Sequence, residues 1–517
     1  MKLNTHFGRG LTILAALLPL LSTLRADVVT DWNAIAVQAT LTGSRPGPTG
    51  VFDVATVQVA VYDAIQAIEK RYEPYYVDVP GAAGSSTVAA AKAAHDVLVH
   101  RFPAQSSALD NAYQQYLSNH GLSENDPGAA VGAAAAAGII ALRAADGSFP
   151  ASAPAPFTGG LSPGVWRPTP PANLAMFAPW MAHVVPFSLT RPSQFSCPSP
   201  PALTSTEYAR DYDEVKALGA QNSTARTADQ TDMAYFHAGN VVVMWNQALR
   251  DIAAARVQHI ADSSRLFALA NMATADCLIA AWNDKKRYAF WRPITAIREG
   301  ATDDNAATAP DAEWQPLLTT PNYPDYPSGA ANFASAATRV IEHFFETDYI
   351  PFSITTTNTG PTAQDTRSYA RLSDAAQEVV DARIYSGIHF RFADEAARAQ
   401  GRQVADWIFG TRMRPLGSRS AVTTVHLVNI SARGLVQTGD DVLITGFIVE
   451  GASEKNVIVR ALGPSLPLAR NLPDPSLELF DRNGTALAVN DNWRDAEQAA
   501  IIATGLAPND ERESAVV

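Results

Sequence analysis

The chain has 517 residues, a formal net charge of −12, and 47% apolar and 17% charged residues. This length predicts more than one domain, and the apolar share is sufficient for a large core. The negative charge argues against a general nucleic-acid-binding protein, which would present a basic surface, but it allows a locally basic pocket.

Residues 1–26 resemble a secretory signal sequence. Lys2 and Arg9 give it a positive start, 11–24 is an apolar run shorter than a membrane span, and Ala26 is acceptable before a cleavage site. We therefore expect export to the periplasm or the extracellular space; the alternative is an uncleaved anchor. No later stretch approaches about 18 unbroken apolar residues, so no stable membrane span is expected.

Residues 27–412 have the periodicity of a mainly α-helical domain. The clearest helical segments are 51–68, the alanine-rich 88–99 and 129–145, and the apolar face over 257–281. Alanine favours both helix formation and close packing of neighbouring helices.

Residues 150–201 interrupt this pattern with thirteen prolines. Because proline blocks helix interiors, we predict a long irregular excursion between two helical halves. Such a loop is either a lid or channel wall, or a passive wrap over the surface, and the sequence favours neither. The sequence also leaves open whether Cys197 and Cys277 form a disulfide.

The composition changes after Gly410. Residues 413–421 are predicted to be a linker, and 422–517 a small β-sandwich. Its expected strands are 425–430, 442–449, 457–462 and 477–480, with a turn at 481–484. Because the sequence ends within another strand-like run, 514–517, we expect this β-domain to be incomplete.

Three short segments in the middle of the chain concentrate cationic side chains. In the first, Lys285 and Arg292 are seven residues apart and share a helix face if the helix persists, although Pro293 should loosen it. In the second, Ser328 is a predicted N-cap, and the N-terminus of a helix with Gly329 at its start binds anions.

The third segment contains Arg383 and His389, six residues apart and therefore on different faces of a continuous helix. Gly387 is predicted to interrupt that helix, so that both side chains turn toward one pocket. Taken singly, the three segments are also explained by a basic surface cluster, an ordinary capped helix and a structural histidine.

Together, the order and spacing of these residues resemble the signature of the vanadium-dependent haloperoxidase and type 2 phosphatidic acid phosphatase superfamily. The flanks are similar to its exported bacterial haloperoxidase-like branch: 290–293, 324–329 and 384–392. The resemblance covers most of 27–412. It implies a fold of two helical bundles, with an oxyanion site between the helices of one bundle.

The resemblance also implies roles for single residues. Lys285, Arg292 and Arg383 would bind the oxyanion, as would Ser328 Oγ and the Gly329 N–H. His389 would bond to vanadium or act as a phosphate nucleophile, with Lys285 and Arg383 as its catalytic partners. The substrates would be halide and peroxide with vanadate as cofactor, or a phosphate ester with no cofactor.

The chain departs from the family pattern at two positions. Ala330 stands where the family has an acid–base histidine, and the acidic residue expected four positions after His389 is replaced by Ala393, with Asp394 one position later. Losing a general acid–base group typically costs about 10²–10⁴ in rate. His343 is too far along the helix to substitute, whereas His237 could fold over the site.

Three functions therefore remain open: a weakened haloperoxidase with vanadate, an acid phosphatase, and a non-catalytic oxyanion-binding protein. The family resemblance favours the first, and Ala330 shifts weight toward the third. The halide, the ester and the oligomeric state do not follow from the sequence.

Overall fold

The computed structural model describes residues 27–416 except 153 and 359, and residues 442–443, 457–466, 471–481 and 485–517 except 505. The chain divides into two compact units that meet in sequence between Leu416 and Gly417, and each is described by itself. The predicted signal sequence and the predicted strand over 425–430 lie outside the described residues. So do most of the predicted linker, most of the predicted strand over 442–449 and most of the predicted turn over 481–484.

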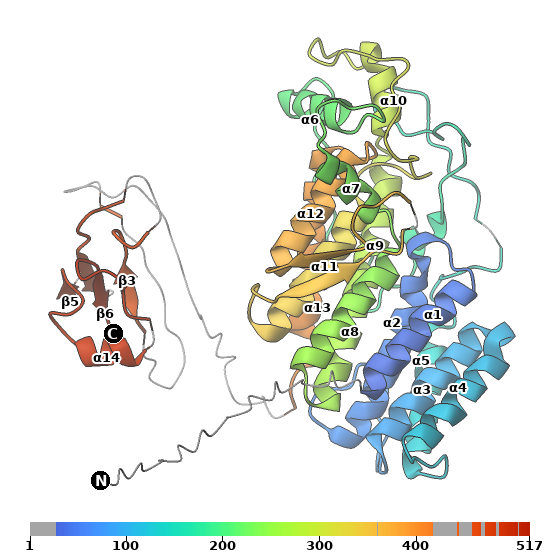
Figure 1. Cartoon of the computed structure of the whole chain (residues 1–517). Coiled ribbons are helices and arrows are strands. Elements are labelled where there is room, and N and C mark those ends of the chain that lie inside the picture. The colour runs from blue at the N-terminus through green and yellow to red at the C-terminus, as the bar shows by residue number, and fades with distance from the viewer. Residues whose placement is uncertain are drawn as a thin grey trace, which may run out of the picture. The chain divides into compact units, whose positions relative to one another are not determined.

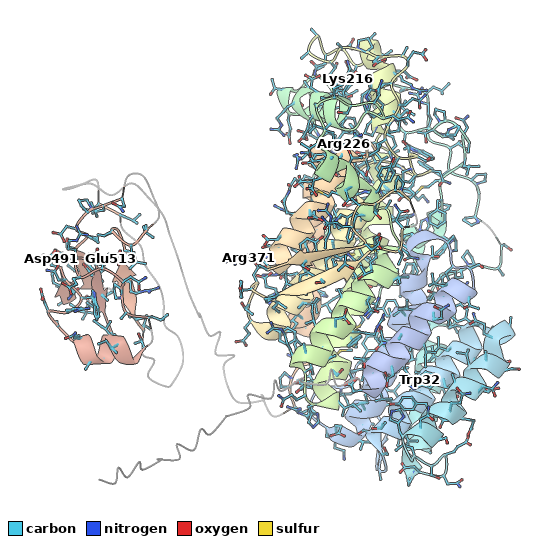
Figure 2. The ribbon with its side chains drawn as sticks, viewed as in Figure 1. Trp32, Lys216, Arg226, Arg371, Asp491 and Glu513 are labelled. Carbon is cyan, nitrogen blue, oxygen red and sulfur yellow. The ribbon has the colours of Figure 1, made fainter. Side chains whose placement is uncertain are left out.

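The first helices of unit 1 form one bundle (Figure 1). They are α1 (Val28–Thr42), α2 (Gly50–Glu69), α3 (Ser86–Arg101), α4 (Ser106–Asn119) and α5 (Pro127–Arg143). Trp32 of α1, labelled in Figure 2, is fully buried. At Gly132 of α5 an added Cβ would lie 2.3 Å from the Ala89 carbonyl oxygen of α3. The close packing predicted for the alanine-rich helices is thus confirmed.

The second bundle contains α8 (Val241–Arg256), α9 (Ile260–Tyr288), α11 (Gly329–Phe345), α12 (Leu372–Tyr385) and α13 (Arg391–Thr411). Helix α11 packs against α9, α12 and α13, and α2 packs against α9 to join the bundles. The helix predicted over 257–281 begins later than expected, because Val257 is the extended C-cap of α8.

Shorter elements complete unit 1. They are α6 (Thr206–Leu218), α7 (Ala228–Phe236), α10 (Pro293–Arg298) and an antiparallel hairpin of β1 (Phe352–Thr355) and β2 (Thr366–Tyr369). The hairpin was not predicted, because its strands are only four residues long and lie within a helical sequence.

The proline-rich excursion is irregular, as predicted, apart from the 3₁₀ turn η3 (Pro179–His183). It is pinned to α9: Asp276 accepts the N–H groups of 187–189, and Asp284 accepts the Cys197 N–H at 2.7 Å. Trp166 N–H donates to the Ala289 carbonyl at 2.6 Å. The excursion therefore lines the end of α9. Cys197 and Cys277 are both buried and form no disulfide.

Within the described residues, two helices are long and apolar enough to cross a membrane, Gly47–Glu69 and Ile260–Tyr288. Their apolar windows are 89% and 94% buried inside the protein. This burial is typical of core helices.

The described part of unit 2 contains short antiparallel ladders and one helix. Strand β3 (Val459–Ala461) pairs with β6 (Ser514–Val516), β4 (Leu477–Phe480) pairs with β5 (Ala486–Asn490), and α14 spans Gln498–Ala503. Glu513, labelled in Figure 2, accepts hydrogen bonds from the N–H groups of Gly463 and Ser465 and from the Ser465 hydroxyl. A mainly α chain with a small β-rich unit is thus confirmed.

Candidate oxyanion site

The first cationic segment is a turn between two helices. Lys285 lies in the last turn of α9, which ends at a left-handed C-cap, Ala289. Arg292 is the extended N-cap of α10, and Pro293 is the first residue of that helix. The helix therefore does not persist from Lys285 to Arg292. The turn, rather than a shared helix face, brings the two cations together.

Ser328 is the N-cap of α11, as predicted. Its N–H donates to the Ala393 carbonyl at 3.0 Å, which ties the turn to the first turn of α13. The first N–H groups of α11, including that of Gly329, have no acceptor within the helix. The start of α11 therefore presents free N–H donors and the positive end of a helix dipole, as an anion site requires.

The third segment breaks the chain between α12 and α13. Gly387 has a φ of +76° and packs so tightly that an added Cβ would lie 2.3 Å from the Gly219 carbonyl oxygen. This interruption, predicted from the sequence, leaves Arg383 at 8% and His389 at 2% exposed. Both side chains therefore lie in the interior, beside the first two segments.

Backbone carbonyls hold the two cations of the first segment. Lys285 Nζ donates to the Pro324 and Asp325 carbonyls at 2.7 and 3.1 Å. Arg292 Nε donates to the Tyr323 carbonyl at 2.8 Å, and its Nη1 to that of Ile388 at 2.6 Å. Both cations are thus oriented by the segments that carry Ser328 and His389.

His389 lies between Arg292 and Asp325. Its Nε2 is 3.1 Å from Arg292 Nη1, and since a guanidinium only donates, Nε2 must accept. The proton is therefore on Nδ1, which is 2.7 Å from Asp325 Oδ1, although the contact lacks ordinary hydrogen-bond angles. Burial lowers the pKa of His389 well below its usual range, and the surrounding cations lower it further, so the imidazole is neutral.

Asp325 supplies the partner for His389 that the sequence did not identify. Its carboxylate is fully buried and 3.5 Å from Arg292 Nη1. Burial raises its pKa to about 7, against the opposing effects of Arg292 and Lys285. Its place in the Pro-Asp-Tyr-Pro-Ser-Gly segment was visible in the sequence, but nothing there indicates which imidazole it faces.

Arg383 forms the other side of the cluster. Its Nη1 donates to the His237 carbonyl at 3.2 Å, and its buried Nε has no partner among the described residues. The His237 imidazole is held by Glu378, with Nε2 2.9 Å from Oε1. His237 thus adjoins the site through its backbone, while Glu378 restrains its side chain.

Asp394 is the acidic residue of α13 that belongs to the cluster. It is fully buried, and neither carboxylate oxygen has a hydrogen bond of ordinary geometry within the described part of the chain. Burial raises its pKa well above the usual range, against the opposing effects of the Ser328 hydroxyl and Arg383. The shift of one position from Ala393 is therefore accommodated, because the first turn of α13 places Asp394 among the cations.

Neither Ala330 nor His343 supplies an imidazole where the family resemblance predicts an acid–base histidine. Ala330 is partly buried on α11 and packs against the large core cluster. His343, farther along the same helix, has its Nε2 2.6 Å from Asp406 Oδ1 and is partly exposed. It does not substitute, as expected from its position.

The cluster fits a tetrahedral oxyanion by its donor set. Arg292 Nη2 and Arg383 Nε are buried donors without partners among the described residues. Buried polar groups are normally hydrogen-bonded, so unpaired guanidinium donors beside free helix N–H groups indicate a place for an anion. The neutral His389 Nε2 is the imidazole acceptor of the cluster, and the carboxylate oxygens of Asp325 and Asp394 are its other acceptors.

A separate cavity of about 670 Å³ is lined by Asp213, Asp311, Glu313 and Trp314, among others. None of the cluster residues lines it. Its acidic side chains would repel an oxyanion, so this cavity is not a second candidate for that ligand.

The chain is similar to known proteins over its helical unit. The family described as the VCPO second helical-bundle domain matches residues 265–417. Vanadium chloroperoxidase of Curvularia inaequalis is 27% identical over 198 residues, which span 32% of each chain.

Solved structures share the fold. A bacterial vanadium-dependent iodoperoxidase aligns with a TM-score of 0.64 at 22% identity, covering 75% of this chain and 97% of its own. An apo bacterial vanadium-dependent chloroperoxidase aligns with a TM-score of 0.59 at 20% identity, covering 71% and 94%.

Proposed function

We propose that this chain is a member of the vanadium-dependent haloperoxidase and type 2 phosphatidic acid phosphatase superfamily, and that its cluster binds vanadate and oxidises halide with peroxide. The observation that carries the proposal is the set of buried, unpaired guanidinium donors facing a neutral imidazole. Leaving these buried donors unpaired costs free energy, and a bound anion would remove that cost.

Each residue has a distinct task in this proposal. Arg292 and Arg383 donate N–H groups to the oxyanion, and Lys285, whose pKa burial lowers well below its usual range, adds its amino group as a further donor. Ser328 and the Gly329 N–H bind the same anion from the start of α11. His389 would offer the anion its Nε2 lone pair, which in this structure accepts from Arg292 Nη1, while Asp325 keeps the proton on Nδ1.

Vanadate, when bound, would supply the Lewis-acidic centre that activates peroxide. The protein would hold the anion in a buried site, where the fixed donors need no reorganisation. Ala330 contributes no proton-transfer group at the start of α11. We therefore propose that oxyanion binding is retained more fully than turnover.

We also propose that the chain is exported. Lys2, Arg9 and the apolar run over 11–24 support this, as does the small Ala26 before the predicted cleavage site. N-terminal sequencing of protein recovered from outside the cytoplasm should begin at Asp27. A mature protein that still begins at Met1 would contradict cleavage.

The test combines binding with two activities. Purified protein is titrated with orthovanadate, then assayed for peroxide-dependent halide oxidation and for phosphomonoester hydrolysis. Vanadate binding with halide oxidation is the expected result. Hydrolysis without halide oxidation would favour the phosphatase, and binding with neither activity would favour a non-catalytic oxyanion-binding protein. Absence of binding and of both activities would eliminate the enzyme proposals.

Neighbouring lysines provide a matched control. Lys285 is fully buried, whereas Lys286 is partly exposed and lies 2.8 Å from His183 Nε2. Lys285→Met should weaken vanadate binding at least tenfold, and Lys286→Met should leave it within twofold. Equal effects of the two changes would indicate that only the general charge of the surface matters.

Placing an imidazole at position 330 tests the proposal that turnover is reduced because Ala330 contributes no proton-transfer group. Ala330→His should raise halide oxidation by about 10²-fold, the lower end of the range for an added general acid–base group. An unchanged rate, with vanadate binding intact, would show that the site lacks more than this group.

A further inference from the structure

Tyr323 covers the two cations of the first segment. Its ring centroid lies 4.9 Å from Lys285 Nζ and 4.8 Å from Arg292 Cζ, both within cation–π distance. The ring also packs against Trp282, with centroids 5.1 Å apart, and against Phe177 at 6.5 Å. The side chain is partly buried, so it forms the outer wall of the cationic cluster.

The backbone of this segment is fixed on both sides of the ring. The Tyr323 carbonyl accepts the hydrogen bond from Arg292 Nε, and the Asn322 carbonyl accepts the Phe177 N–H at 2.7 Å. Asn322 Nδ2 in turn donates to the Ala175 carbonyl at 2.9 Å. The proline-rich excursion thus serves as a wall that holds Tyr323 in place, which reduces the entropy cost of using its side chain.

The Tyr323 ring lies beside the Arg292 guanidinium, with its centroid 4.8 Å from Cζ. Burial lowers the pKa of Arg383, and the Tyr323 phenol is the first of the groups that oppose this shift. The same phenol opposes the lowering of the Arg292 pKa, after Asp325. The Tyr323 side chain therefore interacts electrostatically with both arginines and contacts Lys285 and Arg292 through its ring.

This hydroxyl has no hydrogen-bond partner recorded among the described residues. Two other tyrosines near the first two segments differ: Tyr288 donates to the Cys197 carbonyl at 2.6 Å, and Tyr326 donates to the Pro198 carbonyl at 2.7 Å. Their hydroxyls are occupied by the excursion. That of Tyr323 remains available to a ligand.

Trp282 connects Tyr323 to the start of α11. Trp282, which packs against its ring, is the side chain that an added Cβ on Gly329 would approach, at 3.2 Å. Tyr323 is therefore separated from the helix N-terminus by a single indole. Ala330, which follows Gly329, has no donor side chain.

We propose that the Tyr323 hydroxyl donates a hydrogen bond to the bound oxyanion, on the side where Ala330 offers none. The proposal rests on the proposed oxyanion site and adds a neutral donor to its three cations. Such a donor suits vanadate or phosphate alike, because each has tetrahedral oxygens that accept from an O–H group.

The test uses the full chain, with inorganic phosphate and orthovanadate as probes in isothermal titration calorimetry. Tyr323→Phe removes only the hydroxyl and should raise both dissociation constants about tenfold, as for loss of a hydrogen bond to a charged group. Tyr326→Phe is the matched control and should change them less than twofold. Equal melting temperatures for Tyr323→Phe and wild type would establish that the ring packing is intact.

A spectroscopic readout separates ligand contact from a structural role. Phosphate should perturb the near-ultraviolet tyrosine absorption of wild type and of Tyr326→Phe, but not that of Tyr323→Phe. Wild-type affinity in Tyr323→Phe would overturn this proposal while leaving the oxyanion site standing. Absence of phosphate and vanadate binding in wild type would overturn both.

Discussion

Buried carboxylates in two regions of the helical unit have very different surroundings. Asp63, in the first bundle, accepts the N–H groups of residues 75–77 at 2.6, 3.0 and 2.8 Å. Asp276 accepts three more from the proline-rich excursion, at 2.6 to 2.9 Å. Asp325 and Asp394, at the oxyanion site, lack hydrogen bonds of ordinary geometry among the described residues and lie among cations instead.

The difference distinguishes carboxylates that anchor the backbone from carboxylates that belong to the oxyanion site. Burial raises the pKa of Asp63 to about 7 and that of Asp276 to about 6, but the backbone hydrogen bonds oppose the shift in each. Around Asp325, the opposition comes first from Arg292 and Lys285. The pKa of a carboxyl group held by three backbone N–H groups is set by the fold. The pKa of a carboxyl group balanced by cations changes when an anion binds to the same cations.

The strongest way to break the site is to remove its central cation. Arg292→Met leaves Asp325 and the Ile388 carbonyl without their partner in the interior, and should lower the free energy of unfolding by about 3–5 kcal/mol. Urea denaturation measures this loss, and vanadate titration should show no binding. Arg371→Met is the control, because that arginine is 55% exposed and pairs with Asp348 at 3.5 Å, so about 0.5 kcal/mol or less is expected. Similar losses in the two variants would contradict the buried network.

An intermediate effect should distinguish the two kinds of carboxylate. Asp63→Ala leaves three N–H groups unpaired and should cost about 3 kcal/mol by urea denaturation. Asp394→Asn replaces a buried carboxyl group that has no hydrogen bond of ordinary geometry among the described residues, and should cost less than about 1 kcal/mol at neutral pH. Equal losses would mean that Asp394 is also an anchor.

The pH dependence of Asp394→Asn has a defined sign. The raised pKa of Asp394 means that its contribution to stability is full below its ordinary pKa of about 4 and is lost as the pH rises. The variant should therefore gain stability relative to wild type between pH 4 and pH 8.

The smallest expected effect concerns anion affinity and pH. Asp325, with a pKa of about 7, is neutral below that pH, which leaves the cluster more positive. Sulfate keeps its charge across this range, so its dissociation constant should rise about tenfold between pH 6 and pH 8, as for one unit of coupling. Calorimetry at each pH measures it, and Asp63→Asn should keep the same slope. A flat profile in wild type would contradict the coupling.

Much of the fold follows from local sequence patterns. The alanine-rich periodicity predicts α3 and α5, and Ser328 before an amphipathic run predicts the start of α11. These features depend on residues close together in the chain. The β1–β2 hairpin does not, because its short strands are held by packing of β1 against α8, which local propensity does not encode.

The site likewise has features that were predicted from the sequence and features that were not. The order of Lys285, Arg292, Arg383 and His389 predicts a shared oxyanion site through family resemblance, and the structure brings these side chains together. The Asp325 contact with His389 and the Tyr323 ring over the cations were not predicted. Both depend on distances between segments more than thirty residues apart, fixed by the turn at Ala289 and the break at Gly387.

The anchoring of the excursion to α9 has a consequence for chain cleavage. Residues 154–156 are exposed, while downstream the excursion is tied down at Trp166, over 187–189 and at Cys197. A protease that cut the chain at 154–156 would sever the covalent link between the two bundles, yet the fragments would remain joined through the α2–α9 interface. The nicked protein should therefore migrate as one species under native conditions and as two in denaturant.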